Sequence, residues 1–274
     1  MDPVPSQTHD RHATGGKAER LADALLAGAA VPRFAVLPIG LEAADADTLA
    51  AWLCDQRLLL PVAVRSSADV EDGERASYAG MFESRLGVTS PGQLREAVTA
   101  VARSASAARV LSYSARQVVV GGPRLRVLVQ EMIDASAAGV CLVRSPDARD
   151  SIRVEAVSGL GQPLVSGEVE PDVLVLGADD LVVRSRRRGA QYLEMTCDGR
   201  RRAIPAARRT RFKLTEIQVR QVAEVARGLD RHFLFPAGTD VEWAFDRRGA
   251  LYTLQVRPLA RAPLEGDGDR VEAT

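Results

Sequence analysis

Apolar strand patterns that come in adjacent pairs constrain the fold of this chain more than any other feature. The last two patterns, residues 241–246 and 251–259, flank Arg248 and Gly249, which predicts a hairpin. Residues 125–133 are apolar on both faces, as expected of a buried strand. The strand patterns that follow them are residues 139–145, 152–160, 172–177 and 181–186, the last two as a further hairpin. Sequential strands of this kind favour antiparallel pairing.

Helices are predicted between and around these strands. Helical spacing of apolar residues begins near Lys17 and ends before Gly28. The other predicted helices are residues 45–53, 93–115 and 214–229, the last with Leu214, Ile217, Val222 and Val225 near one face. Earlier strand patterns cover residues 31–38, 61–67 and 81–88. This mixture predicts a layered α+β fold rather than a strictly alternating parallel sheet.

Length, charge and cysteine content limit the domain size, the partners and the cellular compartment that we expect for this chain. A chain of 274 residues can bury the core of one two-lobed domain. Its 36 basic and 36 acidic residues balance, so we expect neither nucleic acid nor an anionic membrane as partner. No apolar run reaches the roughly 18 residues of a membrane span. Three cysteines lie far apart without a CxxC pair, which favours a reducing cytoplasm.

Lysine is scarce in this chain. Of the 36 basic residues, Lys17 and Lys213 alone are lysines. An ammonium group is a compact point charge, whereas a guanidinium is a planar fork, so some sites accept lysine and not arginine. The bias therefore marks both lysines as candidates for special roles.

A candidate phosphate site follows the strand pattern 61–67. Arg65 stands at the end of the strand, and Ser66 and Ser67 follow it. The acidic loop 69–73 and a glycine turn at Gly80 come next. A guanidinium gives phosphate a bidentate partner, and glycine lets backbone N–H groups approach it. From these residues alone, an ordinary solvated hairpin loop is the favoured alternative.

The two last strands carry a second polar group. Gln255 and Arg257 lie two apart and therefore share a face, and the hairpin brings Glu242 beside them. A carboxylate, an amide oxygen and a fixed cation could hold Mg²⁺ and a triphosphate. A purely structural Glu–Arg pair is the alternative that this pattern leaves open.

These residues lie in segments that resemble the N-terminal ATP-binding domain of phosphoenolpyruvate synthase, pyruvate phosphate dikinase and rifampin phosphotransferase. Five segments match this family in order: GGKAERL (15–21), VAVRSSADVEDGERASYAGMFES (62–84), VLVQEMIDASAAGVCLVRSP (127–146), EAVSGLGQPLVSGEVEPD (155–172) and TDVEWAFDRRGALYTLQVRPL (239–259). They touch nearly the whole chain, and the VRSSA, GLGxxxVSGEVxPD and LQxRP motifs are specific. The resemblance implies an ATP-grasp fold.

The resemblance also implies a site for ATP and Mg²⁺. It assigns nucleotide contacts to Lys17, Arg65, Gly80, Ser84, Gln130, Met132, Glu242, Gln255 and Arg257. Of these, Lys17, Arg65 and Arg257 would act on the phosphates in catalysis. Glu242 and Gln255 would hold magnesium.

The implied organisation is a disordered lead (1–14), a reduced small lobe (15–122), a larger lobe of antiparallel sheet plus helices (123–260) and a flexible tail (261–274). The implied activity is phosphoryl transfer from ATP, with release of AMP and phosphate. The acceptor would be supplied in trans by a histidine-carrier protein or would be a small molecule. A nucleotide-binding regulatory or partner subunit without turnover is the alternative.

The chain also departs from the family pattern. Gln162 replaces the glutamate of the family's GLGE motif, and Met81 and Phe82 replace two glutamines. His9, His12 and His232 lack the Thr-Ser-His context of a phosphocarrier histidine and are expected to be inert. Arginines crowd residues 184–213. That segment is predicted to be a solvated face, with docking of an acidic partner or phosphorylated substrate as the alternative.

Overall fold

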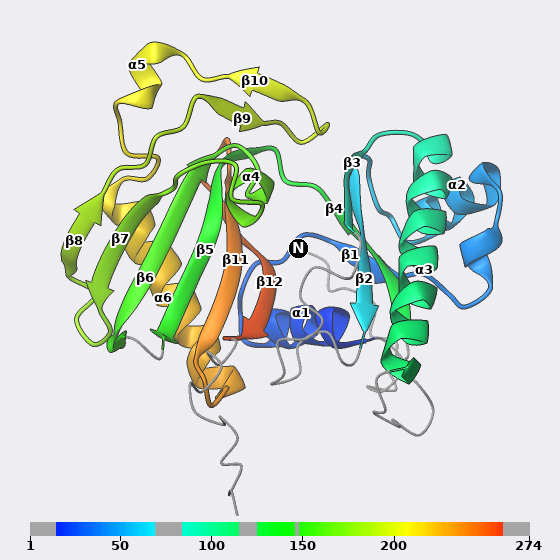
Figure 1. Ribbon diagram of the computed structural model, residues 1–274, viewed down its shortest axis with the longest axis horizontal. Helices are drawn as coiled ribbons and strands as arrows, with labels where there is room; N and C mark the ends of the chain where they lie inside the picture. The colour runs from blue at the N-terminus through cyan, green and yellow to red at the C-terminus, as the bar shows by residue number, and fades with distance from the viewer. Residues whose placement is uncertain (1–14, 69–83, 115–124, 146–147, 260–274) are drawn as a thin grey trace, which may run out of the picture.

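The computed structural model describes residues 15–68, 84–114, 125–145 and 148–259. Two lobes, each built on an antiparallel sheet, lie side by side (Figure 1), and residues of both line the cleft between them. The predicted lead 1–14, tail 261–274 and glycine turn at Gly80 lie outside the described residues. The predicted fold class, α+β with two lobes, is confirmed.

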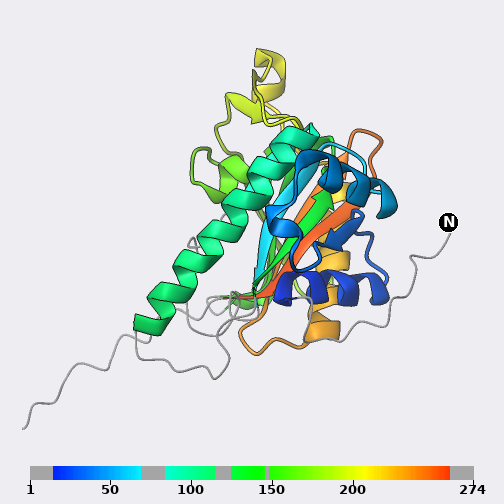
Figure 2. The same ribbon diagram turned by 90° about the vertical axis from the view of Figure 1, so that its right-hand side faces the viewer.

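The small lobe is a four-stranded sheet in the order β1-β4-β2-β3. Its strands are β1 (Phe34–Val36), β2 (Val62–Ala68), β3 (Ser84–Val88) and β4 (Leu125–Glu131). Its outer face is covered by η2 (Leu41–Ala43), α2 (Ala46–Asp55) and the long α3 (Pro91–Ser114), as Figure 2 shows. Asp45 caps α2 by accepting a hydrogen bond from the Thr48 N–H at 2.8 Å.

Alternation along β2 and β4 decides what faces the cleft. Val64 and Val129 point into the apolar core under α2 and α3. Arg65 and Gln130, one position further on, point into the cleft instead. Sheet pairing thus places β4 in the small lobe, whereas the predicted boundary at 122/123 assigned it to the large one. Its residues are hydrogen bonded between β1 and β2, which fixes that membership.

The large lobe is a six-stranded antiparallel sheet in the order β12-β11-β5-β6-β7-β8. Its strands are β5 (Ala135–Ser145), β6 (Ala148–Ser158), β7 (Asp172–Gly177), β8 (Val183–Arg187), β11 (Thr239–Asp246) and β12 (Leu251–Pro258). The helix α6 (Glu216–Phe233) packs on one face of this sheet, and the opposite face is turned toward the viewer in Figure 1. The helix α1 (Gly16–Leu26) contacts β12 and β2, and so lies beneath the cleft between the lobes.

The buried face of α6 differs from the predicted one. Val219, Val222, Ala226 and Leu229 are buried against the sheet, whereas Ile217 is 73% exposed. At 3.6 residues per turn, Ile217 lies on the opposite side of the helix from Ala226. The prediction for Ile217 was therefore wrong. Among the described helices, none combines the length and apolar character needed to cross a membrane.

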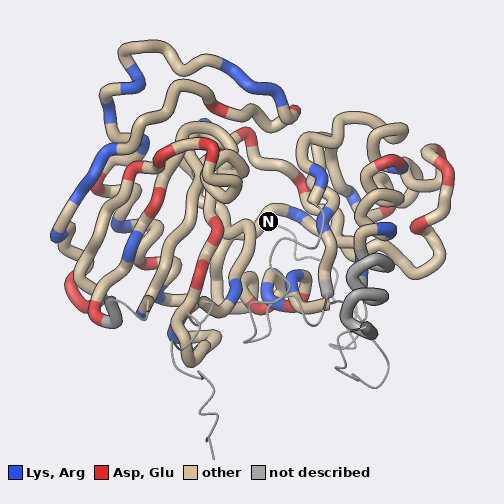
Figure 3. The backbone as a smooth tube through the Cα atoms, in the orientation of Figure 1, with Lys and Arg blue, Asp and Glu red and all other residues tan. Residues whose placement is uncertain are grey.

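A small substructure above the large sheet has no counterpart in the predictions. It contains the short helix α4 (Gln162–Val165), the hairpin of β9 (Leu193–Met195) and β10 (Arg201–Ala203), and α5 (Ala206–Arg209). Basic residues lie within β8, β10 and α5, and Figure 3 shows them in blue along this part of the backbone. Several of them are ion-paired: Arg184 with Asp180, Arg186 with Glu216, Arg201 with Glu168, and Arg202 and Arg208 with Glu194.

The tip of the β9–β10 hairpin touches the small lobe at Gly87. Gly87 has a φ of 68°, and a Cβ atom there would lie 2.7 Å from the Asp198 carbonyl carbon and the Gly199 nitrogen. These neighbours are backbone atoms, so they cannot swing aside. The contact joins the two lobes on one side of the cleft.

Gly87→Ala is therefore expected to lower the free energy of unfolding by about 1–3 kcal/mol, because it combines left-handed strain with a backbone clash. Urea unfolding followed by tryptophan fluorescence measures the change. Gly92→Ala is the matched control, since a Cβ atom at this helical glycine meets nothing within 4 Å. It should raise stability slightly. Equal effects of the two variants would contradict the proposed contact.

Candidate functional site

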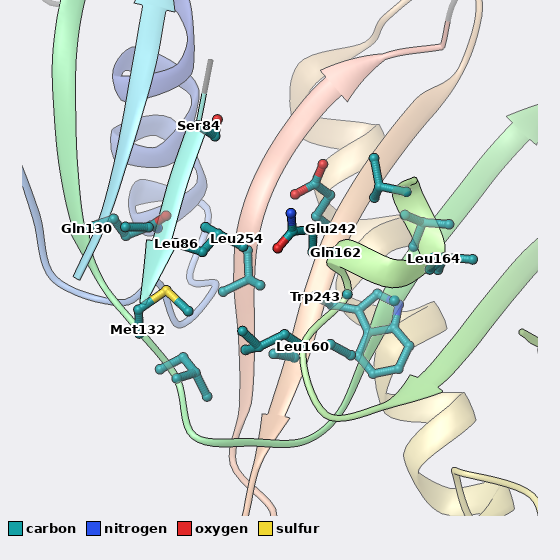
Figure 4. A pocket seen from close by; sticks show the side chains of 18 of the residues that line it. Ser84, Leu86, Gln130, Met132, Leu160, Gln162, Leu164, Glu242, Trp243 and Leu254 are labelled. Carbon is teal, nitrogen blue, oxygen red and sulfur yellow. The ribbon is translucent and has the colours of Figure 1, made fainter. Parts of the chain in front are cut away.

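The cleft between the lobes holds a cavity of about 210 Å³ (Figure 4). The inner face of the small sheet contributes Ala63, Arg65, Leu86 and Gln130. The facing surface of the large lobe contributes Ala138, Val140, Leu160, Gln162, Glu242 and Leu254. Met132 and Ile133, in the link between β4 and β5, close one end.

The end of the cavity near this link is apolar. Ala138, Leu160, Met195 and Ala244 form a buried cluster there, with Met132, Ile133 and Leu254 packed against it. Small alanines on two adjacent strands leave a shallow surface rather than a filled core. Such a surface suits the face of a planar ring system.

The polar end is organised around Arg65. Its guanidinium donates to Gln255 Oε1 at 2.5 Å, to Glu242 Oε2 at 3.3 Å and to the Leu254 carbonyl oxygen at 3.3 Å. A fourth, longer contact reaches Gln130 Oε1 at 3.4 Å. Glu242 and Gln255 are direct cross-strand partners on β11 and β12, as the hairpin prediction requires. The guanidinium therefore links the small lobe to both strands of the large one.

Arg257 lies two residues after Gln255 on β12 and so shares a face of the sheet with it. Its cross-strand partner is Asp240, and Arg257 Nε lies 2.7 Å from Asp240 Oδ2. Burial raises the pKa of Asp240, and the carboxylates of Glu242 and Glu155 add to the rise, while Arg257 opposes it. Desolvation lowers the pKa of Arg257, but Asp240 and Glu242 outweigh it and the net shift is upward.

Asp240 was missed in the sequence analysis. It lies two positions before Glu242 and one residue before the predicted strand 241–246, whereas β11 begins at Thr239. A strand prediction with this start would have placed both carboxylates on one face by the period-2 rule. Arg257 is ion-paired with Asp240 and Glu242 with Arg65, so a structural ion pair stays open as the alternative for both residues.

Several buried polar atoms at this end have no hydrogen-bond partner within the part of the chain that the structure describes. They are Asp240 Oδ1, Arg65 Nε and Gln130 Nε2. An unpaired buried oxygen beside Glu242 and Gln255 fits a hard cation such as Mg²⁺, which prefers oxygen ligands. Unpaired N–H donors on Arg65 and Gln130 fit an anion. The residues present are thus compatible with a metal–phosphate group.

Lys17 lies beside the Arg65 strand but does not line the cavity. Its ammonium donates to the Ser66 carbonyl oxygen at 3.1 Å, and the Ala18 N–H donates to Ser67 Oγ at 3.3 Å. Gly15 has a φ of 79°, and a Cβ atom there would lie 2.2 Å from the Ser67 carbonyl oxygen. The residue before α1 therefore lies so close to the backbone of β2 at Ser67 that position 15 requires glycine.

The predicted residues are placed as follows. Arg65, Ser84, Gln130, Met132 and Glu242 line the cavity, and Figure 4 labels the last four of them. Gln255 reaches it through Arg65, and Arg257 lies in the next row of the sheet. His232 sits at the end of α6, with its ring edge against Phe233.

Comparison with known proteins identifies relatives. The model of the family described as "Pyruvate phosphate dikinase, AMP/ATP-binding domain" matches residues 35–272. The prodigiosin synthesizing transferase PigC of Serratia marcescens is 33% identical over 72% of this chain and 22% of its own length. A rifampicin phosphotransferase of a Streptomyces species is 32% identical over 72% of this chain and 23% of its own. Phosphoenolpyruvate synthase of Pyrococcus furiosus is 28% identical over 77% of this chain and 27% of its own length. The chain thus spans about a quarter of the length of these relatives.

Solved structures give weaker matches. PH1788 from Pyrococcus horikoshii aligns with a TM-score of 0.49 at 10% identity, covering 89% of this chain and 91% of that chain. An L-amino acid ligase from Bacillus licheniformis aligns with a TM-score of 0.45 at 14% identity, covering 89% of this chain and 42% of the ligase chain.

Proposed function

Because the chain belongs to the family of the pyruvate phosphate dikinase AMP/ATP-binding domain, an ATP-grasp domain, we propose that it transfers a phosphoryl group from ATP in the cleft. Release of AMP and phosphate, as the resemblance implies, is part of the proposal. The acceptor is a histidine-carrier domain or protein, or a small molecule. The observation that carries the proposal is the Arg65 cluster, in which one guanidinium bridges both lobes at the polar end of an apolar cavity.

The two ends of the cavity have different roles in this proposal. Met132, Leu160 and Leu254 hold the adenine ring by apolar contact. Arg65 and the amide of Gln130 receive the phosphates, because both carry buried N–H donors that lack a partner among the described residues. Lys17, on the neighbouring segment, adds positive charge on the same side.

Charge neutralisation is most of what phosphoryl transfer requires. Glu242, Gln255 and Asp240 would hold Mg²⁺, which when bound neutralises charge on the phosphate oxygens. Arg65 and Arg257 supply the fixed cations. Asp240 holds Arg257 in place through its 2.7 Å ion pair. An arginine that is already oriented needs little reorganisation during the reaction.

The test combines nucleotide binding with product analysis on the purified chain. We expect ATP to bind in a Mg²⁺-dependent manner, and AMP and phosphate to form when an extract supplies an acceptor. Glu242→Gln should weaken the Mg²⁺-dependent part of binding by about tenfold to a hundredfold, since it removes a ligand charge. Binding without added metal should change little.

The main alternative is a nucleotide-binding subunit without turnover. Gln162, which lines the cavity, favours it because an amide stands where the family motif has a carboxylate. ATP that binds with Mg²⁺ but is never consumed would support this alternative. Formation of ADP instead of AMP would identify a simple kinase.

A further inference from the structure

The face of the large sheet that bears Glu242 continues beyond the cavity onto β6 and β7. Cross-strand pairing places Gln255, Glu242, Val140 and Glu155 in one row across β12, β11, β5 and β6. Partners in a row share a face, so Glu155 lies on the same face as Glu242. The opposite face is packed against α6.

Val140 separates the two carboxylates. Val140 lines the cavity, whereas Glu155 lies just past its edge. Since neighbouring strands are about 4.8 Å apart, the Cα atoms of Glu242 and Glu155 are separated by about 10 Å.

Glu155 is held from one side only. Arg153 Nε lies 2.7 Å and its terminal nitrogen 2.6 Å from the same atom, Glu155 Oε1. Oε2 accepts no hydrogen bond from the residues that the structure describes. The side chain is 16% exposed, so Oε2 can be reached from the open face. Arg153 thus fixes a carboxylate that presents one free oxygen.

Resting on the proposed function, we propose that Glu155 binds the phosphoryl acceptor by accepting a hydrogen bond from its N–H or O–H group, and that Arg153 positions Glu155. The acceptor then lies between Glu155 and the phosphates held near Glu242. Glu155, Glu242 and Asp240 are each paired with an arginine, so the selectivity comes from Glu155 Oε2 rather than from the net charge of the face. An unpaired carboxylate oxygen repels a carboxylate or phosphate acceptor and accepts a hydrogen bond from an uncharged nucleophile that carries a proton.

Glu155 takes part in the transfer step by receiving the acceptor's proton or by stabilising its positive charge. The acceptor's lone pair forms a bond to the β-phosphorus of ATP, and the bond from that phosphorus to the oxygen shared with the α-phosphorus breaks, so that AMP leaves with the electron pair. Water then releases the γ-phosphate from the pyrophosphorylated acceptor. A hydroxyl acceptor gives its proton to Glu155. An imidazole acceptor becomes positively charged, and its second N–H is stabilised by Glu155.

The experiment uses the full chain with ATP-Mg²⁺ and simple probes in place of the unidentified acceptor. Imidazole and glycerol represent proton-bearing nucleophiles, and acetate and inorganic phosphate represent anionic ones. Nucleotide consumption is followed against probe concentration, and ³¹P NMR identifies the phosphorylated product. ATP affinity is measured separately for every variant.

We expect imidazole or glycerol, and not the anions, to accelerate ATP consumption. Glu155→Gln should raise the half-saturating concentration of the probe about tenfold or more, the effect of losing a hydrogen bond to a charged group. Glu155→Asp should recover part of the loss. ATP affinity should stay unchanged in both variants. Glu224→Gln on the exposed side of α6 is the matched control.

Three outcomes overturn the inference while ATP-Mg²⁺ binding persists. They are acceleration by acetate or phosphate equal to that by imidazole, no acceleration by any probe, and a Glu155→Gln variant that behaves like wild type. Loss of ATP binding in the wild-type chain is a different result, because it removes the proposed function itself.

Discussion

Arg65→Met is expected to lower ATP consumption by about 10²–10³-fold, the cost of removing one preorganised donor from a transition state. Methionine keeps much of the volume of the arginine stem but removes the charge and every N–H donor. Arg65 is the group that contacts Gln130 of the small lobe and Glu242 and Gln255 of the large lobe at once. Its loss removes both phosphate binding and the polar link between the lobes.

The measurement is the rate of nucleotide consumption together with ATP affinity. Arg65→Lys should recover little of the activity, because an ammonium cannot reproduce a planar fork with several partners. Arg220→Met, on the exposed side of α6, is the matched control and should behave like wild type. Full activity in Arg65→Met would contradict the assignment of this residue to the phosphates.

Arg65 also contacts the two side chains proposed to hold magnesium. Its guanidinium lies 2.5 Å from Gln255 Oε1 and 3.3 Å from Glu242 Oε2. A guanidinium and a divalent cation compete for the same oxygens. The same Arg65→Met variant should therefore bind Mg²⁺ at least as well as wild type in the absence of nucleotide, while it binds ATP more weakly. This combination distinguishes a local effect on the site from unfolding.

Strand alternation made much of the site predictable from the sequence. Glu242 and Gln255 pair directly because a hairpin and the period of two leave few other registers. Long helices and strands with clear apolar periodicity were placed well for the same reason. The ATP-binding assignment itself came from resemblance, since Arg65 and its neighbours alone were compatible with a solvated loop.

Other features could not be read from the sequence, because they depend on contacts between distant segments. The β9–β10 hairpin has short strands rich in arginine, and its position depends on Glu194, which accepts hydrogen bonds from Arg202 and Arg208. The membership of β4 in the small sheet is set by pairing with β1 and β2. Neither the hydrogen bonds of Glu194 nor the strand pairing of β4 can be recognised from the neighbouring residues in the sequence.

Lys213 received no functional role from the sequence, but the structure explains why a lysine stands there. Its Nζ lies 3.3 Å from Asp172 Oδ1, and the exposed fractions of the two side chains are 3% and 1%. Asp172 also accepts hydrogen bonds from the Gly189 N–H at 2.9 Å and from the Lys213 N–H at 2.7 Å. The carboxylate thus connects two points of the arginine-rich segment, Gly189 and Lys213, to β7. A compact ammonium fits this enclosed site better than a guanidinium.

Breaking this pair should cost more stability than any surface substitution in the segment. Lys213→Met leaves a buried carboxylate that keeps two backbone donors, so we expect a loss of about 3 kcal/mol in the free energy of unfolding. Asp172→Ala leaves a buried ammonium and two N–H groups without an acceptor, and should cost about 5 kcal/mol. Urea unfolding measures both values, and Trp52 and Trp243 report on the small and large lobes respectively.

The exposed pair Arg186–Glu216 provides the matched control. Its side chains are 56% and 71% exposed, so Arg186→Met should change stability by less than about 1 kcal/mol. The order of effects, Asp172→Ala above Lys213→Met and both above Arg186→Met, follows from what each change leaves buried and uncompensated. A Lys213→Met variant as stable as Arg186→Met would show that Asp172 is satisfied without the lysine, and the scarcity of lysine would then need another explanation at this position.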